Sequence, residues 1–172
     1  MASAGRPRLP GRPAVVQPLF AWHFTPEAKE EIVVNYIALA GRICFAAMFI
    51  FAAPGHFTAA YVGYAAQAGV PAARLLVPLS GLIALLGGLS IVLGYKAKLG
   101  ALLLVVFLIP VTVTMHGFWA VTDPMMRQLQ LAMFLKNLSM LGGALLIAYF
   151  GSGPLSLDSR QAASPAPINP GR

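Results

Sequence analysis

The stretch Leu129–Phe150, LQLAMFLKNLSMLGGALLIAYF, decides the fold of this chain. It is long enough to cross a membrane as a helix, because about 20 apolar residues span the hydrocarbon core. Lys136 and Asn137 lie inside it, and a lysine at such a depth costs about 2.5 to 3.5 kcal/mol on insertion scales. Asp123 is a good helix cap and Pro124 suits the first helical position. The sequence therefore predicts a membrane-spanning helix from Pro124 to the end of this stretch, with a polar site inside it.

The composition extends this interpretation to the whole chain. Of the 172 residues, 58% are hydrophobic and only 10% are charged, which excludes an ordinary soluble domain. Residues 32–53, 75–93 and 99–115 form further apolar runs of membrane-spanning length, alongside 129–150. Backbone groups in lipid must be hydrogen-bonded within the chain, and the links are short. We therefore predict an all-α membrane protein, a four-transmembrane-helix antiparallel bundle.

The bundle is expected to occupy residues 26–153. Residues 1–25 are rich in proline and arginine, and prolines prevent a long helix, so we expect a disordered cytoplasmic arm. The lack of acidic residues there is also typical of an organelle presequence, but the prolines disfavour the amphipathic helix of one. Residues 154–172 repeat this composition and are expected to form a disordered cytoplasmic tail. Thr58 can cap a short helix from Ala59 to Gln67, which we expect to lie in the outer interface.

The net charge of +7 reflects topology better than nucleic-acid binding, because the cations lie at the borders of the apolar runs. Eight basic residues fall on one side and two on the other: Arg6, Arg8, Arg12, Lys29, Lys96, Lys98, Arg160 and Arg172 against Arg74 and Arg127. The positive-inside rule then places both termini in the cytoplasm. The single cysteine, Cys44, excludes an intrachain disulfide and is expected in the core. Three scattered histidines and one cysteine predict no metal site.

Two cations in the apolar runs have no acidic residue at their depth. Arg42 is expected near the middle of the first span, and Lys136 in the outer half of the last. No Asp or Glu occurs between Glu31 and Asp123, or between Asp123 and Asp158. In one interpretation both cations bond carbonyl groups or reach the interface, and they only fix the helix register.

The alternative interpretation is a pocket that opens outward and binds an anionic or carbonyl-bearing ligand. A quinone, a small oxyanion or a lipid phosphate would suit such donors. His116 could relay protons, because histidine titrates near neutrality. The candidate ligand-binding residues are Arg42, His116, Lys136, Asn137, Thr112 and Ser139. No catalytic residue is identified.

Three segments support a family resemblance: GRICFAAMFIFAAPGHF from Gly41, PLSGLIALLGGLSIVLGYKAKLGALLLVVFLIPVTVTMHGFWA from Pro78, and FLKNLSMLGGALLIAYFGSGPLSLD from Phe134. Together they resemble the DoxX family of small four-helix bacterial membrane proteins. That resemblance implies the bacterial cytoplasmic (inner) membrane and a link to sulfur and redox-stress pathways, including thiosulfate:quinone oxidoreductase. It implies no established catalytic residues.

Three functional hypotheses follow. The first is a redox-associated membrane component that binds a quinone or a small sulfur oxyanion in the outward pocket. The alternative is a non-catalytic accessory subunit that packs against a larger membrane complex through the small-residue faces of the second and fourth spans. A small-solute carrier is the third, and four helices could form one only as an oligomer. The expected partners are the lipid bilayer and other membrane subunits or a second copy, with no nucleic acid.

Overall fold

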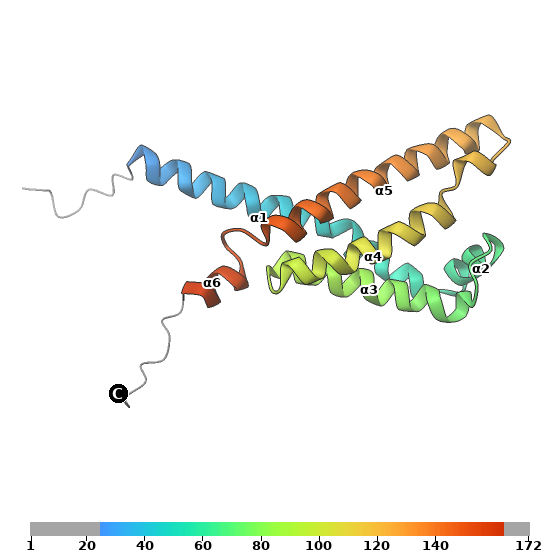
Figure 1. The fold of residues 1–172 in the computed structure, drawn as a ribbon, viewed down its shortest axis with the longest axis horizontal. Coiled ribbons are helices and arrows are strands. Elements are labelled where there is room, and N and C mark those ends of the chain that lie inside the picture. The colour runs from blue at the N-terminus through green and yellow to red at the C-terminus, as the bar shows by residue number, and fades with distance from the viewer. Residues whose placement is uncertain (1–24, 164–172) are drawn as a thin grey trace, which may run out of the picture.

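The computed structural model describes residues 25–163, which form helices and turns without a strand. The elements are α1 (Pro26–Ala52), η1 (Ala53–Phe57), α2 (Ala59–Gln67), α3 (Ala73–Leu93), α4 (Ala97–Met115), η2 (Phe118–Ala120), α5 (Pro124–Phe150) and α6 (Leu157–Ala163) (Figure 1). The spans in α1, α3, α4 and α5 are long and apolar enough to cross a membrane. The predicted all-α membrane class is confirmed. The arm expected before the first span falls largely on residues 1–24, outside the described part of the chain.

Local capping signals set the limits of two helices. The carboxylate of Asp123 accepts a hydrogen bond from the backbone N–H of Met126 at 2.8 Å, and Pro124 follows it as the first residue of α5. The hydroxyl of Thr58 accepts one from the N–H of Tyr61 at 3.3 Å at the start of α2. Side-chain oxygens at these positions satisfy N–H groups that a helix start leaves unbonded. Both helices have the limits that the sequence predicts.

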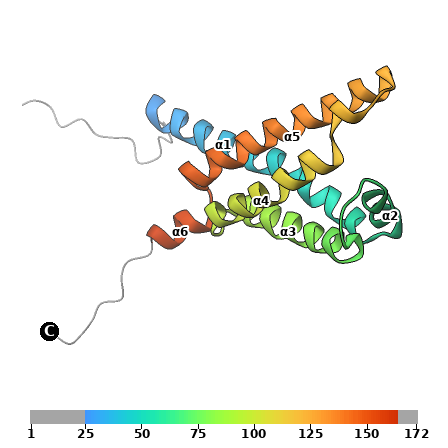
Figure 2. The same ribbon diagram turned by 45° about the vertical axis from the view of Figure 1, so that its right-hand side comes forward.

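The four long helices pack in the order α1, α3, α4, α5. Helix α3 contacts α1 on one side and α4 on the other, and α5 packs mainly against α4. Helices α1 and α5 cross in both views (Figures 1 and 2) and come close at Gly143, where an added Cβ would lie 2.8 Å from the ring of Phe45. Over the rest of its length α5 therefore has one principal neighbour.

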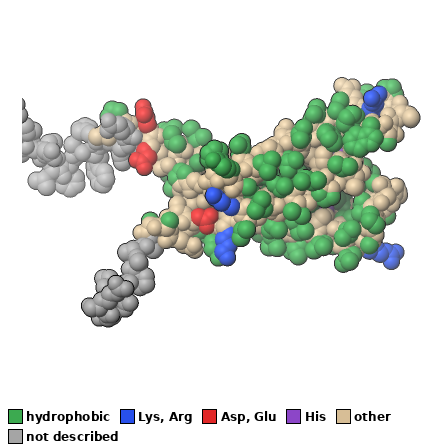
Figure 3. All heavy atoms as spheres, in the orientation of Figure 1, with side chains coloured by type: hydrophobic (Ala, Val, Ile, Leu, Met, Phe, Trp, Pro, Cys, Tyr) green, Lys and Arg blue, Asp and Glu red, His purple; other side chains and the backbone are tan. Residues whose placement is uncertain are grey.

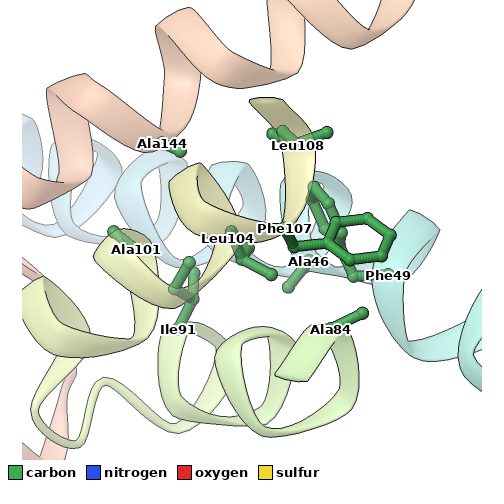
Figure 4. Packing of buried hydrophobic residues seen from close by; sticks show 9 residues of the cluster. All are labelled: Ala46, Phe49, Ala84, Ile91, Ala101, Leu104, Phe107, Leu108 and Ala144. Carbon is green, nitrogen blue, oxygen red and sulfur yellow. The ribbon is translucent and has the colours of Figure 1, made fainter. Parts of the chain in front are cut away.

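Glycines on α3 allow its two neighbours to come close. A Cβ added at Gly87 would lie 2.9 Å from the carbonyl oxygen of Gly100 on α4, and one at Gly88 would lie 3.0 Å from Ile50 on α1. Small residues at such contacts let membrane helices approach. The core forms around them, as Figure 4 shows, from Ala46, Phe49, Ala84, Ile91, Ala101, Leu104, Phe107, Leu108 and Ala144. Cys44 was expected in this core but is exposed.

Helix α1 extends well beyond α3 at its N-terminal end (Figure 1). Val34 and Ile37 in this part are exposed. Gly94, the residue that follows α3, has Arg42 directly beside it. Arg42 therefore lies level with the turn between α3 and α4, although it stands near the middle of the apolar span Lys29–Phe57. Counting residues along α1 does not reveal this neighbour, because α1 extends beyond α3 at its N-terminal end (Figure 1).

Residues 151–163 fold back onto the turn between α3 and α4. The N–H of Asp158 donates to the carbonyl oxygen of Gly94 at 2.9 Å, and α6 begins beside it. Ser152 and Ser156 are buried and joined by a 3.0 Å hydrogen bond. The disordered tail expected from residue 154 is therefore not found for residues 154–163. These contacts order the segment, and none of them is visible in its composition.

Candidate functional site

Arg42 is bound by the C-terminal segment of its own chain. Its Nη2 donates to the carbonyl oxygens of Leu155 at 2.7 Å and Pro154 at 3.3 Å. The side chain is only 5% exposed, and its Nε and Nη1 have no hydrogen-bond partner among the described residues. The hydrogen-bond partners of this cation therefore come from residues 154 and 155.

Asp158 also caps α4 from outside that helix. Its two carboxylate oxygens accept hydrogen bonds from the N–H groups of Lys96 at 2.8 Å and Ala97 at 3.2 Å. Lys96 has a left-handed backbone with φ of 49° and no side-chain cap of its own. A carboxylate is favourable at this positive helix end. Sequence reasoning missed this role because Asp158 lies 62 residues after Lys96, and no local pattern links the two.

Thr112 and His116 lie at the far end of α4. The hydroxyl of Thr112 donates to the carbonyl oxygen of Leu108 at 2.6 Å, so its proton is used inside the helix. Nδ1 of His116 lies 2.8 Å from the side-chain oxygen of Gln130, which can accept a hydrogen bond from it. At about 1.5 Å of rise per residue, Thr112 is roughly 22 Å from the start of α4. The structure therefore does not bring Arg42 together with Thr112 or His116.

The three candidate residues on α5 differ in how far they are buried. Asn137 is buried, with 4% of its surface exposed. Ser139 is exposed, and its hydroxyl donates to the carbonyl oxygen of Leu135 at 3.0 Å. Lys136 is half-buried, and across residues 25–163 it has neither a hydrogen bond nor an ion pair. Of these two cations, only Arg42 has hydrogen-bond partners in the part of the chain that the structure describes, and they bind its Nη2 alone.

Two hollows of about 550 Å³ each open on the surface. One lies between the α3–α4 turn and the segment from Phe150 to Ser159, and the other lies between α2 and the start of α3. Neither is lined by His116 or Lys136. In the described residues no three His, Cys, Asp or Glu side chains gather as a metal site would require.

Residues 14–163 match the SURF4 family, which is most of the chain. The chain belongs to the SURF4 family. This finding corrects the resemblance to the DoxX family, which no comparison supports. The glycines and apolar runs that suggested it are general requirements of close helix packing in lipid, so they discriminate poorly between families of small helical membrane proteins.

Three curated relatives of this SURF4-family chain are informative. It is 25% identical over 150 residues to the ER-derived vesicles protein ERV29 of Saccharomyces cerevisiae, which covers 86% of this chain and 42% of the relative. It is 28% identical over 137 residues to the Surfeit locus protein 4 homolog of Drosophila melanogaster, and this match covers 79% of this chain and 45% of the relative. It is 33% identical over 123 residues to the inner membrane protein YqjF of Escherichia coli, and this match covers 70% of this chain and 88% of the relative. No solved structure matches the chain.

The chain spans less than half the length of the first two relatives and most of the third. Family and helices together make it a multi-pass membrane protein. The relatives come from different membranes, since one is named for vesicles from the endoplasmic reticulum and another for the bacterial inner membrane. None of the comparisons supports a quinone or a redox role.

Proposed function

We propose that this chain is a non-catalytic accessory protein that holds a partner protein inside the bilayer through α5. Lys136 is the residue that selects the partner, by pairing with an acidic side chain in a transmembrane helix. The observation that carries this proposal is the half-buried ammonium group of Lys136, which has no partner in the described residues. A cation in a membrane span is costly unless another group pairs with it.

The surface around Lys136 suits a helix. Helix α4 covers one side of α5, and its other sides are largely open. Leu138 is 51% exposed and Leu146 is 61% exposed. A Cβ added at Gly142 would meet no atom within 4 Å, so another backbone has room to approach there. Small residues next to leucines are typical of helix contacts in lipid.

The partner is a different chain, because a second copy cannot supply the acid. The sequence has no Asp or Glu from residue 32 to residue 122, or from residue 124 to residue 157. Asp123 and Asp158 already cap α5 and α4. These residues therefore offer no carboxylate at the depth of Lys136, and the proposal assigns that carboxylate to the span of a partner protein.

The quinone and oxyanion hypothesis has less support from the same geometry. It required Arg42, His116 and Lys136 to face one cavity, whereas Arg42 is engaged by Pro154 and Leu155 at one end of α4 and His116 lies at the other end. Among the candidate residues, Lys136 and the exposed Ser139 lie three positions apart on one face of α5, and these suit a protein partner as well as a ligand.

We further propose a bacterial cytoplasmic membrane with both termini in the cytoplasm. Eight basic residues on the proposed inner side against two on the outer side support this orientation. In a Cys44→Ser background, Thr122→Cys should react with a membrane-impermeant maleimide on intact cells, and Ala163→Cys should react only after the cells are opened. The reverse pattern would invert the topology.

A crosslinking experiment tests the partner role. A photoreactive amino acid at Leu138 should crosslink to a membrane protein with Asp or Glu in one of its spans, in native membranes. Lys136→Met should abolish the product, Lys136→Arg should keep it, and Arg74→Met serves as the charge-matched control. Exchanging the two charges, with Lys136→Glu and the partner's acid changed to lysine, should restore it. An unchanged product in Lys136→Met would refute the proposal.

A further inference from the structure

We infer that the hollow at the α3–α4 turn binds the phosphate group of an anionic phospholipid. This hollow of about 550 Å³ lies at the opposite end of α4 from His116 and is independent of the role proposed for Lys136. Its walls come from the turn between α3 and α4, from the end of α5 with the glycine–serine–glycine turn after it, and from the start of α6. Three segments that are distant in sequence thus form one site.

Two lysines in the walls are available to an anion. The side chain of Lys98 lies over Gly151, where an added Cβ would be 3.3 Å from its Cε. Nζ of Lys96 lies 5.6 Å from the ring centroid of Tyr95. Neither ammonium group donates a hydrogen bond or forms an ion pair in the part of the chain that the structure describes. Figure 3 shows charged side chains gathered beside α6, next to a broad hydrophobic surface.

The acidic group in the walls is already engaged. Asp158 accepts hydrogen bonds from the backbone N–H groups of Lys96 and Ala97, and Ser152 donates to it at 3.3 Å. Its negative charge is directed at the positive end of α4. The two lysine side chains therefore leave the hollow with an excess of positive charge. Phosphate is the anion that several donors of this kind bind well.

The apolar part of the wall favours a lipid over a free phosphate. Leu99 is 58% exposed and Phe150 is 74% exposed, and both line the hollow. Both belong to membrane-spanning helices, so they continue the hydrophobic surface toward the bilayer. A phospholipid offers the matching arrangement, with a phosphate at the level of the lysines and acyl chains against the apolar residues. A free anion would use the lysines alone.

Lipid binding should also order the C-terminal segment, because residues 151–159 form one wall of the site. Arg42 already holds this wall through the carbonyl oxygens of Pro154 and Leu155. A phosphate that bridges Lys96 or Lys98 to the segment would add to that attachment. Amide hydrogen exchange in residues 151–163 is therefore a second measure of binding.

Native mass spectrometry of the full chain in a neutral detergent tests the site with added phosphatidylglycerol, phosphatidylcholine or inorganic phosphate. We expect phosphatidylglycerol to bind, phosphatidylcholine to bind much more weakly, and inorganic phosphate not to displace the lipid. The double variant Lys96→Ala/Lys98→Ala should weaken phosphatidylglycerol binding about tenfold per lysine, since a charged hydrogen bond contributes about this factor. Phosphatidylglycerol should also slow amide exchange in residues 151–163 of the unmodified chain.

The matched control is Arg74→Ala/Arg127→Ala, which removes two cations from the other ends of α3 and α5 and should leave lipid binding unchanged. The single variant Lys98→Ala repeats the test if the double variant does not fold. Equal loss of lipid in both double variants would refute the site, as would equal binding of the two lipids. Displacement by inorganic phosphate would refute the lipid assignment.

Discussion

Arg42 on α1 and Lys136 on α5 begin from the same sequence signal, a cation inside an apolar run without an acidic neighbour. In the structure Arg42 reaches two carbonyl oxygens more than 110 residues away in sequence, whereas Lys136 has no partner among residues 25–163. The difference shows that a missing acid in the sequence does not mean a missing partner. Arg42 has hydrogen-bond partners within residues 25–163, and Lys136 has none there.

The largest effect is expected from Arg42→Met. This change removes two hydrogen bonds from a charged donor, each worth up to about 1.5 to 3 kcal/mol, and releases residues 151–163. We expect the free energy of unfolding in detergent to fall by about 2 to 3 kcal/mol, with faster amide exchange in that segment. Arg42→Lys should keep part of the stability. If Arg42→Met changes neither the free energy of unfolding nor the amide exchange of residues 151–163, the contacts of Arg42 do not stabilise the chain. The proposed difference between Arg42 and Lys136 would then be wrong.

Gly94→Ala tests the same contact between Arg42 and the C-terminal segment, because it adds a side chain where the two meet. Gly94 has φ of +62°, and an added Cβ would collide with Arg42 and Ser156. An alanine in this left-handed conformation costs about 1 to 2 kcal/mol even without the collision. We therefore expect a loss of at least that size in thermal or denaturant unfolding. Gly142→Ala is the matched control on α5, where an added Cβ meets open space and the change should be neutral or slightly stabilising.

The smallest effect on the isolated chain is expected from Lys136→Met. Because Lys136 has no partner in the described residues, its removal should leave the free energy of unfolding unchanged or raise it by up to about 1 kcal/mol. This change in the free energy of unfolding has the opposite sign to the change expected for Arg42→Met. Unfolding both variants in the same detergent measures the difference. A loss of more than about 1 kcal/mol would mean that Lys136 is compensated inside the chain.

The helices could be predicted from sequence because their signals are local. Asp123 with Pro124, and Thr58 with the residues after it, mark the starts of α5 and α2, and both helices have the predicted limits. Apolar runs of membrane length likewise indicated the long helices. These signals depend on residues within a few positions of one another, so they can be recognised without knowing the tertiary structure.

The candidate site could not be predicted in the same way, because its partners are distant in sequence. Nothing near Arg42 in sequence indicates Pro154 or Leu155, and its position along α1 does not indicate that it lies beside Gly94. The segment after residue 153 has the composition of a disordered tail, yet the hydrogen bonds of Asp158 and Arg42 order it up to residue 163. The family was also misjudged, because packing requirements that many families share carried the resemblance.

The cap on α4 has a consequence for biosynthesis. The carboxylate that completes the first turn of α4 belongs to Asp158, which is synthesised after all four long helices. While the ribosome is still making α5, the N–H groups at the start of α4 must rely on water or lipid headgroups. The hairpin of α3 and α4 therefore reaches its final form only when Asp158 has emerged from the ribosome, and truncation before that residue would leave α4 without its cap.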